Sequence, residues 1–184
     1  MRMIQRSAGM LSLFTLTVLG LAQPAPAQGP DFDLGFIDNM VIHHQGALDM
    51  AGEALKQAKR PELKTFAKQV IEDQTTEIAQ MKKWREAWYK GAPSARSEKI
   101  PGMPMTQGGG HQGMAGMSGR TAATYDVQFL DNMIAHHEGA IQMANEALTK
   151  AKRAEIRQLA QGIIRAQQAE IEQMKKWKAE WEKR

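Results

Sequence analysis

Two pairs of adjacent histidines are the residues of this sequence whose type and spacing best support chemistry. His43-His44 follow Met40 in the stretch DNMVIHHQGALDMA, and His136-His137 stand in the related stretch DNMIAHHEGAIQMA. In a helix of 3.6 residues per turn, Met40 lies one turn before the first pair and on the same side. Imidazole and thioether groups together favour Cu(I), Ag(I) and Cu(II), whereas zinc and nickel gain little from methionine.

The two histidine stretches belong to one duplicated segment. Residues 33–89 align without a gap with residues 126–182, at an offset of 93, and 29 of the 57 aligned positions are identical. Helical spacing of apolar residues predicts two helices in each copy, with turns at Pro61 and near Lys152–Ala154. One hairpin cannot bury its apolar stripe alone. The pattern therefore predicts an all-α four-helix bundle built from two hairpins, with a swapped or dimeric arrangement of hairpins as the alternative.

The second helix of each copy brings a carboxylate and a further methionine. Glu77 falls on the apolar side of its helix, where an unpaired charge is costly. In an antiparallel hairpin that turns near residue 60, Glu77 lies opposite His44, and Met81 lies opposite Met40. We therefore expect each copy to gather two imidazoles, two or three thioethers and one carboxylate at one end of the bundle, away from its hairpin turn.

The predicted metal ligands are five matching positions in each copy: Met40, His43, His44, Met50 and Met81, with Met133, His136, His137, Met143 and Met174. Glu77 and Glu170 are either ligands or, as we favour, carboxylates that orient a histidine beside the metal. We expect Gln74 and Gln167 to be hydrogen-bonding residues of the core, and Trp84 and Trp88 to pack in it.

The segment between the copies differs from both. Residues 91–123 are rich in glycine and other small residues and lack a helical period, which predicts a flexible linker. The segment nevertheless contains the same donor types as the helices. Its candidate ligands are Met103, Met105, His111, Met114 and Met117.

The N-terminus has the features of an export signal. Arg2 and Arg6 precede an apolar stretch that is too short to span a bilayer, and a small-x-small cleavage site follows. An uncleaved interfacial anchor is the alternative. We expect a periplasmic or secreted protein that is not inserted in the membrane after cleavage. The predicted organisation is residues 1–27 as signal peptide, 28–90 as first hairpin, 91–123 as linker and 124–184 as second hairpin.

Composition excludes several classes of function. The chain of 184 residues has no cysteine, so it forms no disulfide, thiolate metal site or iron–sulfur cluster. Two of the 24 Lys and Arg residues lie in the predicted signal, and the other 22 nearly balance the 20 Asp and Glu residues, which gives no basic face for nucleic acid. No Glu-x-x-His pair for a di-iron site and no catalytic motif is present, so the sequence does not predict an enzyme.

The stretches DNMVIHHQGALDMA and DNMIAHHEGAIQMA, followed by QTTEIAQMKKW and QQAEIEQMKKW, resemble a known family. The chain is similar to the bacterial secreted domain of unknown function 305 (DUF305), which includes CopM-like periplasmic copper-binding proteins. The resemblance covers nearly the whole chain between signal and C-terminus except the linker. It implies a ferritin-like four-helix bundle that binds copper, and sometimes silver, through the ten Met and His positions given above.

The sequence therefore predicts a periplasmic protein that binds copper, chiefly Cu(I), and sequesters or passes it on to confer metal tolerance. Its expected partners are the ions themselves and other periplasmic copper-handling proteins, and a homo-oligomer is compatible with the pattern. Two alternatives are a metal-dependent oxidase that uses the same sites, and a structural or interaction bundle without metal.

Overall fold

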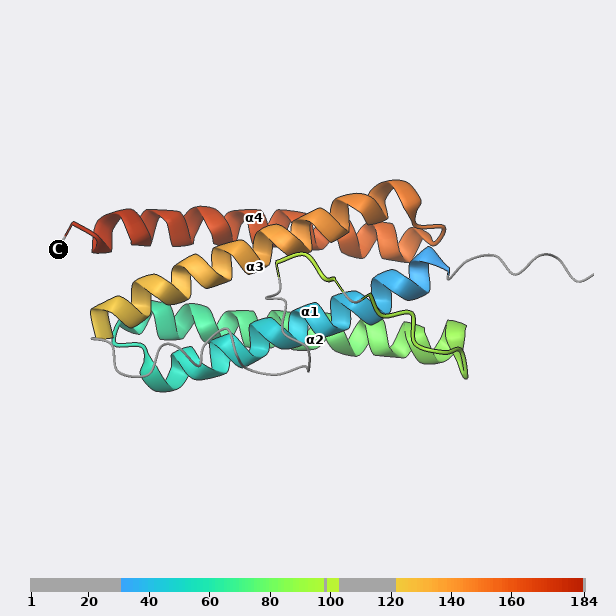
Figure 1. Cartoon of the computed structure of the whole chain (residues 1–184), viewed down its shortest axis with the longest axis horizontal. Helices are drawn as coiled ribbons and strands as arrows, with labels where there is room; N and C mark the ends of the chain where they lie inside the picture. Colours follow the sequence, from blue (N-terminus) through green and yellow to red (C-terminus); the bar gives the residue numbers. More distant parts are fainter. Residues whose placement is uncertain (1–30, 98, 103–121, 184) are drawn as a thin grey trace, which may run out of the picture.

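The four amphipathic segments form four long helices in the computed structural model of the protein, which describes residues 31–97, 99–102 and 122–183. They are α1 (Phe32–Gln57), α2 (Pro61–Tyr89), α3 (Ala122–Lys150) and α4 (Ala154–Trp181). Figure 1 shows them packed side by side along one axis, which confirms the all-α bundle. The predicted signal, residues 1–27, and the five candidate ligands of the linker lie outside the described residues.

Local chemistry explains the starts of the two helices of the first hairpin. The side chain of Asp31 accepts a hydrogen bond from the backbone N–H of Asp33 at 2.8 Å and so caps the start of α1. Pro61 is the first residue of α2, where its missing N–H costs nothing. The second hairpin turns at the place that the repeat predicts, between the end of α3 at Lys150 and the start of α4 at Ala154.

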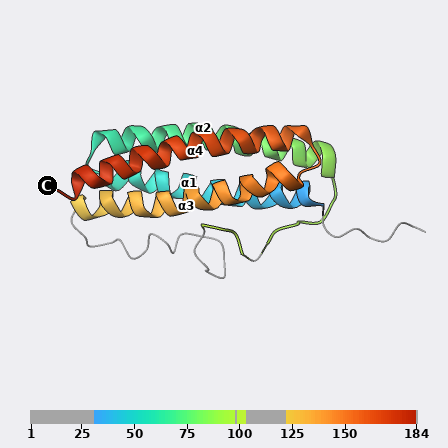
Figure 2. The same ribbon diagram turned by 90° about the horizontal axis from the view of Figure 1, so that it is seen from above.

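The two hairpins lie antiparallel to each other. Helices α1 and α3 are in contact across the middle of the bundle, and they run in opposite directions, so the hairpin turns lie at opposite ends (Figures 1 and 2). In Figure 2, α1 and α3 form one layer, and α2 and α4 form the other. The duplication thus becomes an approximate two-fold relation between the hairpins.

Buried aspartates hold each hairpin turn to the other hairpin. The carboxylate of Asp33, at the start of α1, accepts the backbone N–H groups of Lys152 and Arg153 at 2.9 Å each. Its repeat mate Asp126 accepts the N–H groups of residues 59 and 60, at 3.2 and 3.1 Å. Each carboxylate therefore supplies acceptors for N–H groups before the first turn of a helix in the other repeat.

Stacked tryptophans close both ends of the bundle. The rings of Trp84 and Trp88 are stacked at 5.2 Å, and the guanidinium of Arg153 lies 4.0 Å from the centre of the Trp88 ring. At the other end, Trp177 and Trp181 stack at 5.8 Å, and Arg60 lies 4.3 Å from the Trp181 ring. Trp84 and Trp88 pack against the core but remain partly exposed, so they are less enclosed than the sequence predicts. No helix among the described residues is both long and apolar enough to cross a bilayer.

Candidate metal centre

Both histidine pairs are buried near the middle of the bundle. His43 and His44 lie halfway along α1, and His136 and His137 halfway along α3, and at most 3% of any of these side chains is exposed. The prediction that each site lies at one end of the bundle is therefore wrong. Because the hairpins dock with their turns at opposite ends, a layer halfway along each helix becomes the centre of the assembled protein.

In each hairpin, one histidine is held by the glutamate that the sequence places opposite it. The Nε2 atom of His44 lies 2.6 Å from a carboxylate oxygen of Glu77, and Nε2 of His137 lies 2.7 Å from Glu170. A carboxylate at this distance accepts the Nε2 proton, which leaves the lone pair on Nδ1. In both rings Nδ1 is buried and has no hydrogen-bond partner among the described residues.

The other two histidines meet each other across the interface between the hairpins. The ring centres of His43 and His136 are 3.8 Å apart, with the planes tilted by 46°. Both nitrogens of both rings are buried and lack a hydrogen-bond partner in the part of the chain that the structure describes. Buried polar atoms are rarely left without a partner. Four such nitrogens in one contact therefore mark it as a candidate functional site.

The surroundings keep this pair of rings neutral. Burial lowers the pKa of His43 from 6.5 to about 3, and the neighbouring His44 and His137 rings add to the shift. The backbone of Pro101 lies close to the ring of His43 and opposes this shift, since it favours the protonated form and so raises the pKa. Burial and the adjacent His43 likewise lower the pKa of His136 well below 6.5. Neutral imidazole is the form that binds metal ions.

Four of the six predicted methionine ligands are fully buried in the core. Met40 and Met81 pack in one cluster, and Met133 and Met174 in another. The clusters mix the repeats, since the first also contains Ala140 and Ala144 of α3. The buried thioethers of each hairpin are thus enclosed by side chains of the other.

Met50 and Met143 change partners relative to the prediction. Partly buried Met143 packs against the cluster of Met40 and Met81, and partly buried Met50 packs against that of Met133 and Met174. The sequence groups Met50 with Met40 and Met81, in one repeat, and this grouping is wrong. The cause is the antiparallel docking of α1 and α3. Because His43 faces His136, Met143, seven positions after His136, lies beside Phe36, seven positions before His43.

The buried amides of Gln74 and Gln167 also differ from the prediction. Each is at most 4% exposed, but its side-chain carbonyl oxygen has no hydrogen-bond partner among the described residues. The sequence predicts that these oxygens are hydrogen-bonded in the core.

Within residues 31–97, 99–102 and 122–183, no group of three or more His, Asp or Glu side chains is arranged to hold a metal ion.

Sequence reasoning missed the contact between His43 and His136 and the segment that passes over it. Asp38 and Asn39 bind the backbone of residues 95–97, which leads to Pro101 beside His43. The repetition of Asp-Asn before each Met-x-x-His-His was a visible signal. The repeated Asp-Asn pair did not indicate that Asp38 and Asn39 bind residues 95–97, because this segment follows the first copy and has no counterpart in the second.

A four-helix bundle of two duplicated hairpins, with paired histidines and methionines in its central layer, defines the class of this protein. The chain belongs to the family described as a domain of unknown function (DUF305), whose model matches residues 20–178.

Solved structures of the family share the fold. CopM in the Cu(II)-bound form is 40% identical, with a TM-score of 0.67, and the match covers 81% of this chain and 97% of that one. CopM in the Cu(I)-bound form is 37% identical, with a TM-score of 0.65, over 81% and 96% of the two chains. A DUF305 fragment from Deinococcus radiodurans is 26% identical, with a TM-score of 0.70, over 82% and 97%. CopM also has structures in Ag-bound and apo forms. No curated protein sequence matches this chain.

Proposed function

We propose that this protein binds copper, chiefly as Cu(I), in the central layer of its bundle and acts by holding and releasing the ion, without turnover. The observation that carries the proposal is the set of six buried ring nitrogens without hydrogen-bond partners among the described residues. They come from His43, His44, His136 and His137, in a core that also contains four buried thioethers.

The two kinds of histidine suit two roles. Glu77 and Glu170 each bind Nε2 of one histidine and thereby direct Nδ1 into the core. A carboxylate that orients a histidine in this way is typical of the surroundings of protein metal sites. We infer that Glu77 and Glu170 orient His44 and His137 and do not bind the ion themselves.

Methionine sulfur gives the site its preference for a soft ion. Met40, Met81, Met133 and Met174 are 0% exposed, so water does not compete at their sulfur atoms. Thioethers favour Cu(I) and Ag(I) over hard cations. A neutral donor set in an apolar core also suits an ion of charge +1 better than one of charge +2, since the cost of burying charge rises with its magnitude. Met50 and Met143 are proposed as outer ligands.

The likeness to CopM supports the same conclusion, since CopM has structures with Cu(I), Cu(II) and Ag. On that basis we propose a role in copper sequestration, transfer or tolerance in the periplasm or outside the cell, with copper-handling proteins as partners. The candidate ligands of the linker, residues 91–123, would capture or hand over ions. A purely structural bundle would also pair His44 with Glu77, but it gives no reason for the ring nitrogens of His43 and His136 to lack partners among the described residues.

An anaerobic titration of the metal-free protein with Cu(I), against a competing chelator that absorbs light, tests this function. The variant His43→Ala/His136→Ala should lose most of the tight binding, while circular dichroism confirms that it remains helical. Gly162→Ala, which adds a Cβ in α4 where nothing lies within 4 Å, is the control and should bind as the wild type does. Unchanged binding by the double variant would overturn the proposal.

A further inference from the structure

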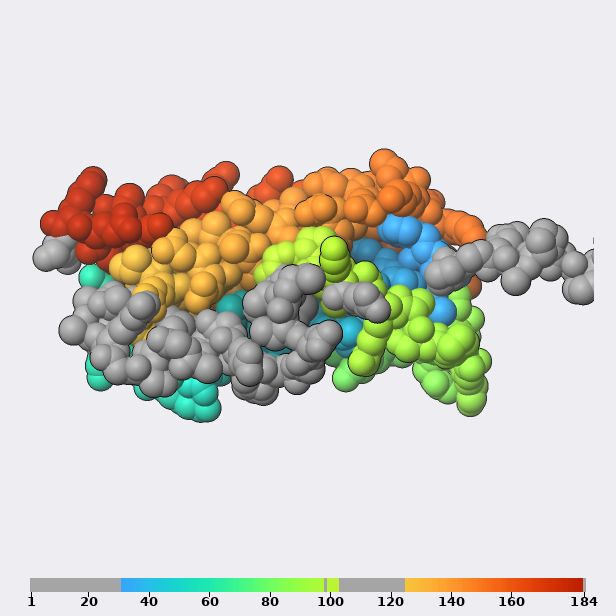
Figure 3. Space-filling view, in the orientation of Figure 1, coloured from blue at the N-terminus to red at the C-terminus, as the bar shows by residue number. Residues whose placement is uncertain are grey.

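Residues 95–97 and 99–102, here called the strap, lie along the layer formed by α1 and α3. The side chain of Asp38 accepts the N–H of Ala95 at 2.8 Å, and Asn39 accepts the N–H of Ser97 at 2.7 Å. Arg85 links Asp38, at 3.1 Å, to the carbonyl of Ala92, at 2.7 Å. Figures 2 and 3 show this segment running over the outer side of α1 and onto α3. Its first half is therefore tied to α1.

The far end of the strap rests on a glycine of α3. A Cβ atom at Gly139 would lie 2.3 Å from the carbonyl oxygen of Pro101 and 2.6 Å from Cα of Gly102. Gly102 has a φ of 73°, a conformation that other residues rarely adopt. The contact between the two backbones thus requires a glycine on each side, and no side chain separates the strap from α3.

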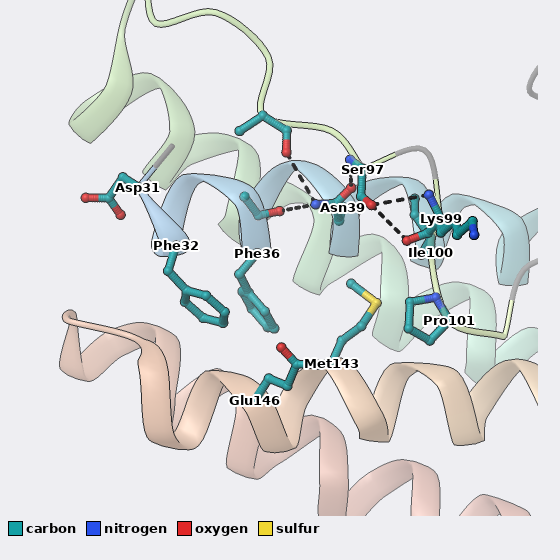
Figure 4. A pocket seen from close by; sticks show the side chains of 12 residues that line it. Asp31, Phe32, Phe36, Asn39, Ser97, Lys99, Ile100, Pro101, Met143 and Glu146 are labelled. Atoms are coloured by element: carbon teal, nitrogen blue, oxygen red, sulfur yellow. Dashed lines mark hydrogen bonds between the residues drawn. The ribbon is translucent and has the colours of Figure 1, made fainter. Parts of the chain in front are cut away.

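Pro101 stands between solvent and the buried pair of histidines. Its carbonyl lies beside the ring of His43, and its side chain forms part of the wall of a surface pocket of about 380 Å³. Figure 4 shows Met143 in the same wall, with its sulfur between Phe36 and Pro101. One face of Pro101 therefore borders the pocket, and another borders the proposed metal site.

In the second repeat, the residues equivalent to Asp38 and Arg85 make a different contact. Asp131, the mate of Asp38, binds the ammonium of Lys178 at 2.6 Å, and Lys178 is the mate of Arg85. The strap is therefore a feature of the first repeat that the duplication does not require.

We propose that the strap is a gate, and that a soft monovalent cation enters through the pocket beside it, with Met143 as its first ligand. This inference rests on the proposed function. Opening lifts Pro101 from Gly139 and connects the pocket to His43 and His136. The cation then moves from the sulfur of Met143 to the buried donors, and closure excludes water from them.

The contacts of the strap suit a segment that opens. Ser97 and Lys99 are exposed, and the strap is held mainly by hydrogen bonds from α1 and by the contact with Gly139. Segments with few buried apolar contacts open at low free-energy cost. Because the strap contributes no side chain to the ligand set, weakening it should speed entry and exit of the ion equally and leave the affinity unchanged.

Stopped-flow transfer of Cu(I) from its bicinchoninate complex to the metal-free full-length protein tests the gate. The component of interest is the one that disappears in His43→Ala/His136→Ala. Asn39→Ala removes a hydrogen bond to the strap, and Gly139→Ala places a Cβ atom against the carbonyl of Pro101. Each should speed this component about tenfold, the change expected when the closed state loses a contact worth one or two hydrogen bonds. Met143→Leu should slow it about tenfold, because the first ligand on the route is missing.

The repeat and the other helices provide matched controls. Asn132→Ala alters the repeat mate of Asn39, and Gly162→Ala adds a Cβ in α4 where nothing lies within 4 Å, so both should load at the wild-type rate. Wild-type rates in both strap variants, or a loss of affinity equal to the change in rate, would overturn the gate. A wild-type protein without the His43- and His136-dependent component would instead overturn the proposed function.

Discussion

Acid should destabilise the metal-free protein through its central histidines. The pKa of His43 is about 3 in the folded protein, against 6.5 without burial. Between these values the unfolded chain binds a proton that the folded protein excludes, so the free energy of unfolding decreases as the pH falls from about 7 toward 3. At pH 5 the loss from His43 alone is about 2 kcal/mol. His136 acts in the same direction, because burial also lowers its pKa.

Urea denaturation of the metal-free protein at pH 7 and pH 5 measures this loss. Other groups also titrate in this range, so the comparison is with His43→Leu/His136→Leu, which keeps an apolar core of similar volume but has no proton to bind at these positions. The wild type should lose at least about 2 kcal/mol more than this variant between the two pH values. An equal loss in both proteins would refute the conclusion that the pair is buried and neutral.

Three further predictions follow from other contacts. Asp33→Ala and Asp126→Ala should each lower the free energy of unfolding, measured by urea denaturation, by about 2–3 kcal/mol, because two backbone N–H groups lose a buried acceptor in each variant. A loss below about 0.5 kcal/mol would contradict this. Glu77→Gln should weaken Cu(I) binding about 10- to 100-fold in a chelator competition, because His44 loses its charged acceptor, and unchanged affinity would argue against the orienting role. Met40→Leu/Met133→Leu should cost less than about 1.5 kcal/mol of stability per site in thermal unfolding but clearly lower the Cu(I) affinity, whereas intact affinity would remove these thioethers from the site.

The hairpins could be predicted from the sequence because their signals are local. Helical periodicity, Pro61 and the offset of 93 indicated four helices and two turns, and the repeat located the turn before Ala154 where the local residues do not. The register within a hairpin is also local, because a short turn fixes it. For this reason the contact of Glu77 with His44 follows from counting back from the turn.

The way in which the hairpins dock is not a local property. It depends on buried carboxylates such as Asp33, which bind the other repeat, and on the close approach of α1 and α3. Because the sequence does not reveal how the hairpins dock, it could not show that His43 meets His136, or that Met143 packs near Met40. The same limit applies to the strap, which the sequence places in a flexible linker, because its anchors at Asp38 and Asn39 are more than fifty residues away.

Anomalous diffraction at the copper absorption edge, from crystals of the protein loaded with Cu(I) under reducing conditions, tests the central claim most directly. The proposed function predicts copper peaks inside the bundle, within bonding distance of imidazole nitrogens of the layer that contains His43 and His136 and of sulfur atoms from the buried methionines. Peaks confined to the surface or to the segment between α2 and α3, with the central imidazoles still without ligands, would contradict it.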